Sequence, residues 1–266
     1  MRTTMLLFCS LLVACGGGQS GVHPGEAAPA HAPGPDPQSL PPVPPADLGG
    51  WSDPGPAQPT DPCPADMVFV PAGSFAAGAT PEQVEMAVDW PDQNFRPRPR
   101  AEHTTGAYCI DLYEYPNVKG EPPRVWVGWA QAGEACASRG RRLCTEDEWT
   151  RACTGDQGWL YPYGDVWEPR RCNDAVDPVG DLARVAGAGA FPGCVSPFGA
   201  YDMDGNVSEW VDQKHELDPE HERVVRGGTM WVAVYGHGCM SRHSHREDGP
   251  NHGDDGFRCC REARTP

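Results

Sequence analysis

Ten cysteines between Cys63 and Cys260 constrain this chain more than any other feature of its sequence. The 266 residues contain twelve cysteines, and the other two, Cys9 and Cys15, lie near the amino terminus. An even number of cysteines behind an export signal is typical of a disulfide framework formed in an oxidising compartment. A zinc site would favour Cys-x-x-Cys pairs, and the sequence contains none. The sequence therefore predicts an exported domain held together by disulfides.

The first residues have the pattern of a bacterial lipoprotein signal. Arg2 is followed by a mostly apolar segment, residues 5–13, and the segment ends in Leu-Val-Ala-Cys at residues 12–15. It is too short to span a bilayer. The pattern predicts a signal peptide over residues 1–14 and a membrane anchor made by acyl chains on Cys15. The alternative is an ordinary signal peptide in which Cys15 is an incidental thiol.

A proline-rich segment follows the cysteine. Residues 16–62 hold thirteen of the chain's 30 prolines and almost no residue able to build a core. Such a segment cannot offset its ordering entropy, so we expect a lipid-anchored, disordered tether over residues 15–62. Gly16 rather than Asp follows the cysteine, which favours the outer membrane, so the expected location is the bacterial cell envelope. The formal net charge of −16 argues against nucleic acid as a partner.

The folded domain is predicted over residues 63–262, with a short tail at 263–266. Residues 67–75 read as a strand, a Pro/Gly turn and the start of a second strand, and residues 108–116 read as a strand stopped by proline. Helical spacing covers residues 129–138. Thr145 and Glu148 form a capping box that starts a second helix, which runs to Cys153. Beyond Cys153 the chain is rich in Gly, Pro, Asp and Asn, so we expect a loop-dominated α+β domain.

Five segments of this domain carry a family resemblance. In order, they are ACASRGRRLCTEDEW (135–149), YPYGD (161–165), GAYDMDGNVSEW (199–210), RGG (226–228) and GFRC (256–259). Together they resemble the successive motifs of the formylglycine-generating enzyme family, also called sulfatase-modifying factors. The resemblance covers roughly residues 63–262. It implies a disulfide-rich fold related to C-type lectins, with little regular secondary structure.

The resemblance also implies structural calcium. The loop that begins at Asp202 concentrates oxygen donors, which suit a hard cation. By resemblance, the ligands are the side chains of Asp202 and Glu209 and the carbonyl groups of Gly205 and Val207. A second calcium site of the family would begin at Asn173 and Asp174, without a clear acidic partner. The alternative for the first loop is a tight turn in which Asp204 and Asn206 bond the backbone.

Disulfide pairings follow from the same resemblance. It implies the pairs Cys136–Cys259 and Cys153–Cys239, each of which closes a loop of about a hundred residues. Cys172 and Cys194 flank one loop and are expected to pair with each other. The remaining four cysteines of the domain supply two more bridges of open connectivity: Cys63, Cys109, Cys144 and Cys260.

Enzymes of this family hold Cu(I) on two thiolates, and those thiolates are missing here. The resemblance places the pair five residues apart, between Gly228 and Cys239, and that segment contains no cysteine. Depending on the direction of alignment, the matching positions are Val232 and His237 or Thr229 and Val234. None of these side chains replaces a soft thiolate, so copper is not expected.

Histidines are the remaining candidates for a transition metal. His243 and His245 are spaced to share one face of a strand, and imidazole binds copper or iron. A zinc-protease motif is missing, because His215-Glu216 would need its second histidine at Pro219. We interpret the histidines as solvent-exposed loop residues.

These observations favour a non-catalytic binding or structural module on an envelope lipoprotein. The expected partners are the membrane, through the lipid on Cys15, and an exported protein or a glycan. Four tryptophans are candidates either for a ligand groove or for the core: Trp126, Trp129, Trp210 and Trp231. The alternative function is a metal-dependent oxidoreductase of the same family that acts on an exported protein.

The anchor gives a direct test. Replacing Cys15 with serine (Cys15→Ser) should leave export possible and abolish acylation, because serine offers no thiol to the diacylglycerol-transferring enzyme. Membrane fractionation should then move the protein from the membrane pellet to the soluble fraction. A Cys15→Ser protein that still sediments with membranes in detergent-free buffer would contradict the lipoprotein assignment.

Overall fold

The computed structural model describes residues 62–78, 80–81, 99–168, 170–174, 184–230, 238–247 and 252–264. All of them belong to one of the chain's two compact units, Pro41–Pro266. The predicted signal peptide, Cys15 and nearly all of the predicted tether lie outside the described residues. Within those residues, every helix is too short or too polar to cross a membrane.

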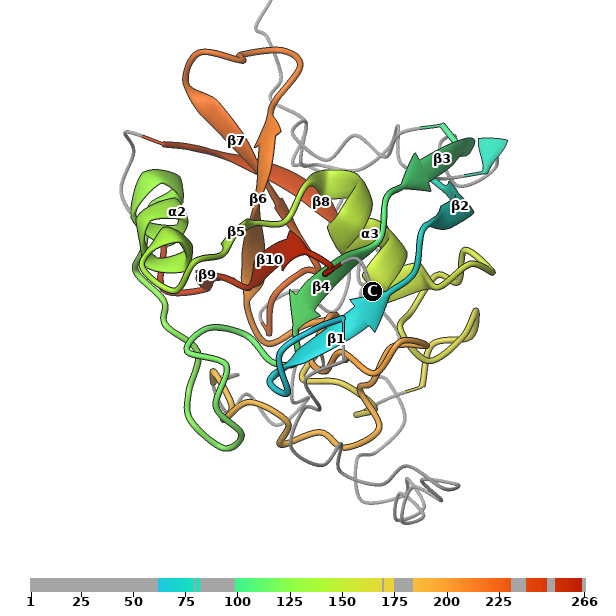
Figure 1. Cartoon of the computed structure of the whole chain (residues 1–266), viewed down its shortest axis with the longest axis horizontal. Coiled ribbons are helices and arrows are strands. Elements are labelled where there is room, and N and C mark those ends of the chain that lie inside the picture. Colours follow the sequence, from blue (N-terminus) through green and yellow to red (C-terminus); the bar gives the residue numbers. More distant parts are fainter. Residues whose placement is uncertain are drawn as a thin grey trace, which may run out of the picture. The chain divides into compact units, whose positions relative to one another are not determined.

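One four-stranded sheet joins the beginning of the domain to its end (Figure 1). Its order is β1-β4-β10-β5, and neighbouring strands are antiparallel. The strands are β1 (Met67–Val70), β4 (Tyr108–Asp111), β10 (Cys259–Glu262) and β5 (Arg142–Leu143). The pairing continues past β10, where the Arg264 N–H donates to the Pro62 carbonyl group at 2.9 Å.

A second four-stranded sheet is built from the last third of the chain. Its order is β8-β7-β6-β9, in which β6 and β9 run parallel and the other pairs are antiparallel. The strands are β6 (Ser208–Lys214), β7 (Glu222–Arg226), β8 (Arg242–Arg246) and β9 (Asp255–Phe257). A separate two-stranded sheet pairs β2 (Gly73–Ala77) with β3 (Ala101–Thr105).

Two helices pack against these sheets. Helix α2 (Trp129–Ala137) contacts β5 and β6, and α3 (Glu146–Thr154) contacts strands of all three sheets. Helix α3 starts as the sequence predicts: the Glu148 N–H donates to Thr145 Oγ1 at 3.2 Å, and the Thr145 N–H donates to Glu148 Oε2 at 2.8 Å. Because α3 is buried along nearly its whole length, it places Trp149 in the centre of the core.

Five disulfides connect these elements. The pairs are Cys63–Cys109, Cys136–Cys259, Cys144–Cys260, Cys153–Cys239 and Cys172–Cys194. Cys136–Cys259 and Cys153–Cys239 are the pairs that the family resemblance implies, and Cys172–Cys194 is the pair expected from its position around one loop. The other two pairs resolve the open connectivity. Successive residues of a strand point to opposite faces. The neighbours Cys259 and Cys260 on β10 therefore reach different partners, one in α2 and one just after β5.

The strands differ from the sequence interpretation in one boundary and add detail beyond Cys153. The predicted strand over residues 108–116 ends at Asp111, because the chain turns before it reaches Pro116. The loop-rich segment beyond Cys153, for which no strand boundaries are predicted from the sequence, contains the five strands β6 to β10. These strands escape a pattern-based prediction because β7 and β9 are buried on nearly every residue, so they lack the alternation of a half-exposed strand.

Candidate functional site

A buried ion pair between Glu209 and Arg258 lies at the centre of the candidate site. Glu209 belongs to β6, and Arg258 connects β9 to β10. Arg258 Nε donates to Glu209 Oε2 and Arg258 Nη2 donates to Glu209 Oε1, both at 2.6 Å. The side chain of Arg258 is 0% exposed and that of Glu209 is 1% exposed. This two-point geometry is what a charge pair needs to offset the loss of hydration.

Further hydrogen bonds tie this ion pair to distant segments. Trp149 Nε1, from α3, donates to Glu209 Oε2 at 2.7 Å. The guanidinium of Arg258 also donates to the carbonyl groups of Tyr201 at 2.8 Å and Asp111 at 3.3 Å. The ion pair thus connects both four-stranded sheets, α3 and the loop before β6.

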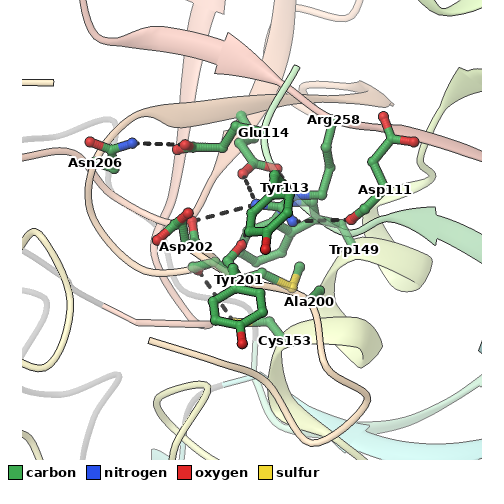
Figure 2. Close-up of polar contacts among 12 residues, drawn as sticks. Asp111, Tyr113, Glu114, Trp149, Cys153, Ala200, Tyr201, Asp202, Asn206 and Arg258 are labelled. Carbon is green, nitrogen blue, oxygen red and sulfur yellow. Dashed lines mark hydrogen bonds and ion pairs between the residues drawn. The ribbon is translucent and has the colours of Figure 1, made fainter. Parts of the chain in front are cut away.

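Two more carboxylates lie close enough to interact with the charge of Arg258 (Figure 2). Glu114 Oε2 accepts from Asn206 Nδ2 at 2.7 Å, and Asp202 Oδ2 accepts from the Gly189 N–H at 2.6 Å. Burial, followed by the negative charges of Asp202 and Glu209, raises the pKa of Glu114 well above its ordinary value. Burial likewise raises the pKa of Asp202 to about 6, against the opposing effect of the Gly189 N–H.

The charges of this cluster favour a cation. Three carboxylates interact with one guanidinium, so full ionisation would leave two negative charges in a buried region. Glu114 Oε1 is buried and has no hydrogen-bond partner among the described residues. Glu209, an expected calcium ligand, already uses three of about four lone-pair positions on Trp149 and Arg258. The unpartnered Oε1 of Glu114 therefore suits a hard cation better than the oxygens of Glu209 do, and Asp202 adds a second buried carboxylate beside it.

The loop from Asp202 to Glu209 carries the other expected calcium ligands and packs closely against the chain at Asn173. Gly205 has φ 74°, and a Cβ at this position would lie 2.4 Å from the Asn173 carbonyl oxygen. Asn206 does not close a local turn. Its Oδ1 accepts from Asn173 Nδ2 and from the Ala186 N–H, each at 2.8 Å. The loop that contains Gly205 and Val207 is therefore fixed by distant segments rather than by bonds to its own backbone.

Asp204 lies close enough to Asp174, an expected ligand of the second calcium site, for their charges to interact. The sequence did not reveal this neighbour. Asp174 Oδ2 accepts from Trp167 Nε1 at 2.7 Å, and Asp204 Oδ1 accepts from the Gly238 N–H at 2.6 Å. The other oxygen of each carboxylate is buried without a hydrogen-bond partner in the described part of the chain. Burial and the charge of Asp174 raise the pKa of Asp204 well above its ordinary value. Asn173 directs its side chain to Asn206 instead.

The segment that matches the family's copper ligands is only partly described. Thr229 is buried directly after Gly228. Val232, Val234 and His237 lie outside the described residues, as does Trp231. The next described cysteine, Cys239, is held by its disulfide and by Arg226 Nη2, which donates to its carbonyl group at 2.6 Å.

The interpretation of the histidines as solvent-exposed loop residues was wrong for three of them. His243 and His245 lie on β8 and are partly buried, because this strand pairs along its whole length with β7. His215 is buried and lies 3.3 Å from a Glu222 carboxylate oxygen. His221 and His252 are exposed, as expected.

The tryptophans divide between the core and the surface. Trp210 is buried and donates its indole N–H to the Val127 carbonyl group at 2.8 Å. Trp129 donates its indole N–H to the Val211 carbonyl group at 3.0 Å. Trp126 is 67% exposed. Trp210 and Trp129 are therefore anchored within the domain, and Trp126 is the one of these three that can present a broad apolar face to a ligand.

Known proteins are similar in sequence to this domain. Residues 114–263 match the family model described as the sulfatase-modifying factor enzyme 1-like domain. A protein of Mus musculus named inactive C-alpha-formylglycine-generating enzyme 2 is 36% identical over 160 residues, which are 56% of this chain and 52% of that protein. The formylglycine-generating enzyme of Mus musculus is 28% identical over 162 residues, 52% of this chain and 43% of the enzyme. This chain thus spans only about half the length of these relatives.

The fold is also found in a solved structure. The structure of PvdO from Pseudomonas aeruginosa matches with a TM-score of 0.56 and 21% sequence identity, over 74% of this chain and 94% of that chain. At this identity the likeness shows the fold alone, and it agrees with the sheet-dominated, disulfide-rich architecture described above.

The two buried glutamates should respond oppositely to the same substitution. Glu209→Gln leaves Arg258 buried without its counter-charge and should lower the free energy of unfolding by about 3–5 kcal/mol. In chelator-treated protein, Glu114→Gln removes a charge that the folded state disfavours and should raise the free energy of unfolding at pH 7. Urea denaturation of the two variants measures both effects.

The pH dependence separates a charge effect from a packing effect. Because the pKa of Glu114 is raised in the folded state, its contribution to stability is present below its ordinary pKa and is lost as the pH rises. The advantage of Glu114→Gln should therefore grow between about pH 4.5 and pH 7 in chelator-treated protein. An advantage that does not change with pH would show that the carboxylate is not responsible.

Proposed function

The chain belongs to the sulfatase-modifying factor enzyme 1-like family, and we propose that its domain is a non-catalytic binding or structural module of an envelope lipoprotein. One observation carries this proposal: the domain offers no thiol for Cu(I). The sequence has no cysteine between Gly228 and Cys239, and all ten cysteines from Cys63 to Cys260 are joined in five disulfides. Copper of the family type needs two thiolates, which a disulfide does not supply.

The relatives support the same proposal. The mouse relative with the higher identity is named as an inactive member, whereas the enzyme that makes formylglycine matches at lower identity. Membership of a family fixes the frame of a domain but not its activity. The frame itself, with its central ion pair and its disulfides, can be kept after a reaction is lost because none of these groups has to react.

We further propose that the module holds an exported protein or a glycan near the membrane. The support is the lipoprotein-like amino terminus, the proline-rich segment that separates it from the domain, and the exposed ring of Trp126. Trp126 is 67% exposed as a residue, so the part of its ring that does not pack against Gly253 offers stacking area to a sugar ring or a peptide side chain.

Calcium is the cation that we propose for the acidic cluster. Asp202, Glu114 and the carbonyl groups of Gly205 and Val207 would hold it, and Asp174 with Asp204 would hold a second ion. The support is the buried carboxylate of Asp202, together with buried oxygens of Glu114, Asp174 and Asp204 that have no hydrogen-bond partner among the described residues. Calcium would supply the positive charge that these carboxylates lack, which is a structural role.

Loss of the family reaction is tested with a peptide substrate. The purified chain is incubated aerobically with Cu(I) and a peptide that carries the sulfatase motif, and the peptide's cysteine should remain unchanged by mass spectrometry. An authentic formylglycine-generating enzyme, treated in parallel, should convert the same peptide. Conversion by this chain would overturn the proposal and select the alternative, a metal-dependent oxidoreductase acting on an exported protein.

Calcium binding is tested by melting. At a free concentration a hundredfold above Kd, one site adds about 2.7 kcal/mol of stability, so the melting temperature should rise with Ca²⁺ and fall with chelator. Asp202→Asn should remove the part of this response that comes from the first site and leave the part that comes from Asp174 and Asp204. Asp212→Asn, at an exposed position of β6, is the matched control and should keep both parts. A melt that does not respond to chelator would contradict the calcium proposal.

A further inference from the structure

Three side chains outside the acidic cluster converge beside the second sheet: His245, His252 and Asp255. Each offers one ligand atom, and these atoms all lie within 4.8 Å of one another. His245 comes from β8 and Asp255 from β9, which are the opposite edges of the sheet. The two side chains nevertheless meet, with His245 Nδ1 lying 2.6 Å from Asp255 Oδ2. His252 lies three residues before Asp255 along the chain.

One oxygen of the Asp255 carboxylate is available to a ligand. Asp255 is 0% exposed. Its Oδ1 is buried without a hydrogen-bond partner among the described residues. A buried polar atom left without a partner costs free energy. The hydrogen bond to His245 uses only Oδ2, so it does not offset the cost of burying Oδ1.

The two imidazole rings lie against each other. Their centroids are 4.4 Å apart and the ring planes are inclined by 34°. Trp210 packs edge-on against His245, with centroids 6.0 Å apart, and limits the orientations of that ring. Two imidazoles and one carboxylate held together in this way are a donor set that divalent transition metals prefer.

The backbone of His252 is held in place by Trp126. The Trp126 N–H donates to the His252 carbonyl group at 3.1 Å. Gly253 follows, and a Cβ at this position would lie 2.7 Å from Cζ2 of Trp126. The missing side chain lets the tryptophan ring pack directly against the chain at Gly253. The exposed imidazole of His252 is thereby presented from an anchored segment rather than from a free loop.

We propose that His245, His252 and Asp255 bind a divalent transition-metal ion such as Zn²⁺. Zinc ligands lie about 2.0–2.2 Å from the ion and therefore more than about 3 Å from one another, so binding replaces the 2.6 Å hydrogen bond between His245 and Asp255. Three protein ligands leave a fourth coordination position for water or for a group of a bound partner. The site is chemically different from the acidic cluster, because calcium takes six to eight oxygens and disfavours imidazole.

The test is calorimetric titration of Zn²⁺ into the disulfide-bonded chain, prepared without a histidine tag and stripped with chelator. We expect one equivalent to bind and His252→Ala to weaken the affinity at least tenfold. His252 is exposed, so this variant should fold normally, which its unchanged melting temperature without zinc would verify. His221→Ala is the matched control, because His221 is also exposed and also contacts an aspartate, Asp218. It should bind zinc as the unmodified chain does.

Two further measurements make the result decisive. Co²⁺ should give visible absorption bands in the unmodified chain and in His221→Ala, and these bands should be absent in His252→Ala. An excess of Ca²⁺ should not displace the bound zinc. The proposal is overturned if zinc does not bind stoichiometrically, or if His221→Ala weakens binding as much as His252→Ala does.

Discussion

A guanidinium with no solvent exposure must obtain both hydrogen bonds and opposite charge from the protein, and Arg258 obtains them from several distant segments. Glu209 of β6 supplies the charge, Trp149 of α3 supports that carboxylate, and the carbonyl groups of Tyr201 and Asp111 complete the set. If any of these segments shifted, a buried charge would lose a partner, which is costly in a medium of low dielectric. The ion pair therefore fixes how the two four-stranded sheets and α3 sit against one another.

The disulfides reinforce the same junction. Cys259 and Cys260 lie next to Arg258 along the chain, and their bridges lead to α2 and to the residue that follows β5. Cys153, in the same core cluster as Cys144 and Cys260, ties α3 to Cys239. The described part of the domain, with short strands and two nine-residue helices, buries little regular backbone. Cross-links that close long loops compensate by restricting the unfolded chain. The disulfides thus stabilise the domain without requiring any of its groups to react.

The interior of the domain is unusually acidic for a region that excludes water. Glu114, Asp174, Asp202 and Asp204 are all buried, and burial is the main cause of the raised pKa of each. Two solutions exist for such groups: they take up protons, or they bind cations. The calcium proposed above would be such a cation, and its role would be structural.

Much of this architecture is determined by the sequence alone. The even set of cysteines predicts a disulfide-bonded domain, the capping box at Thr145 starts α3, and the order of five motifs identifies the family, because each of these signals is local. The functional groupings are not local. Glu114 meets Asn206 across 92 residues, and Asp204 meets Gly238 across 34. His245 and Asp255 come from opposite edges of one sheet, so no spacing in the sequence brings them together. Only the tertiary structure decides such contacts, because a buried charge finds its partner through the packing of the whole chain.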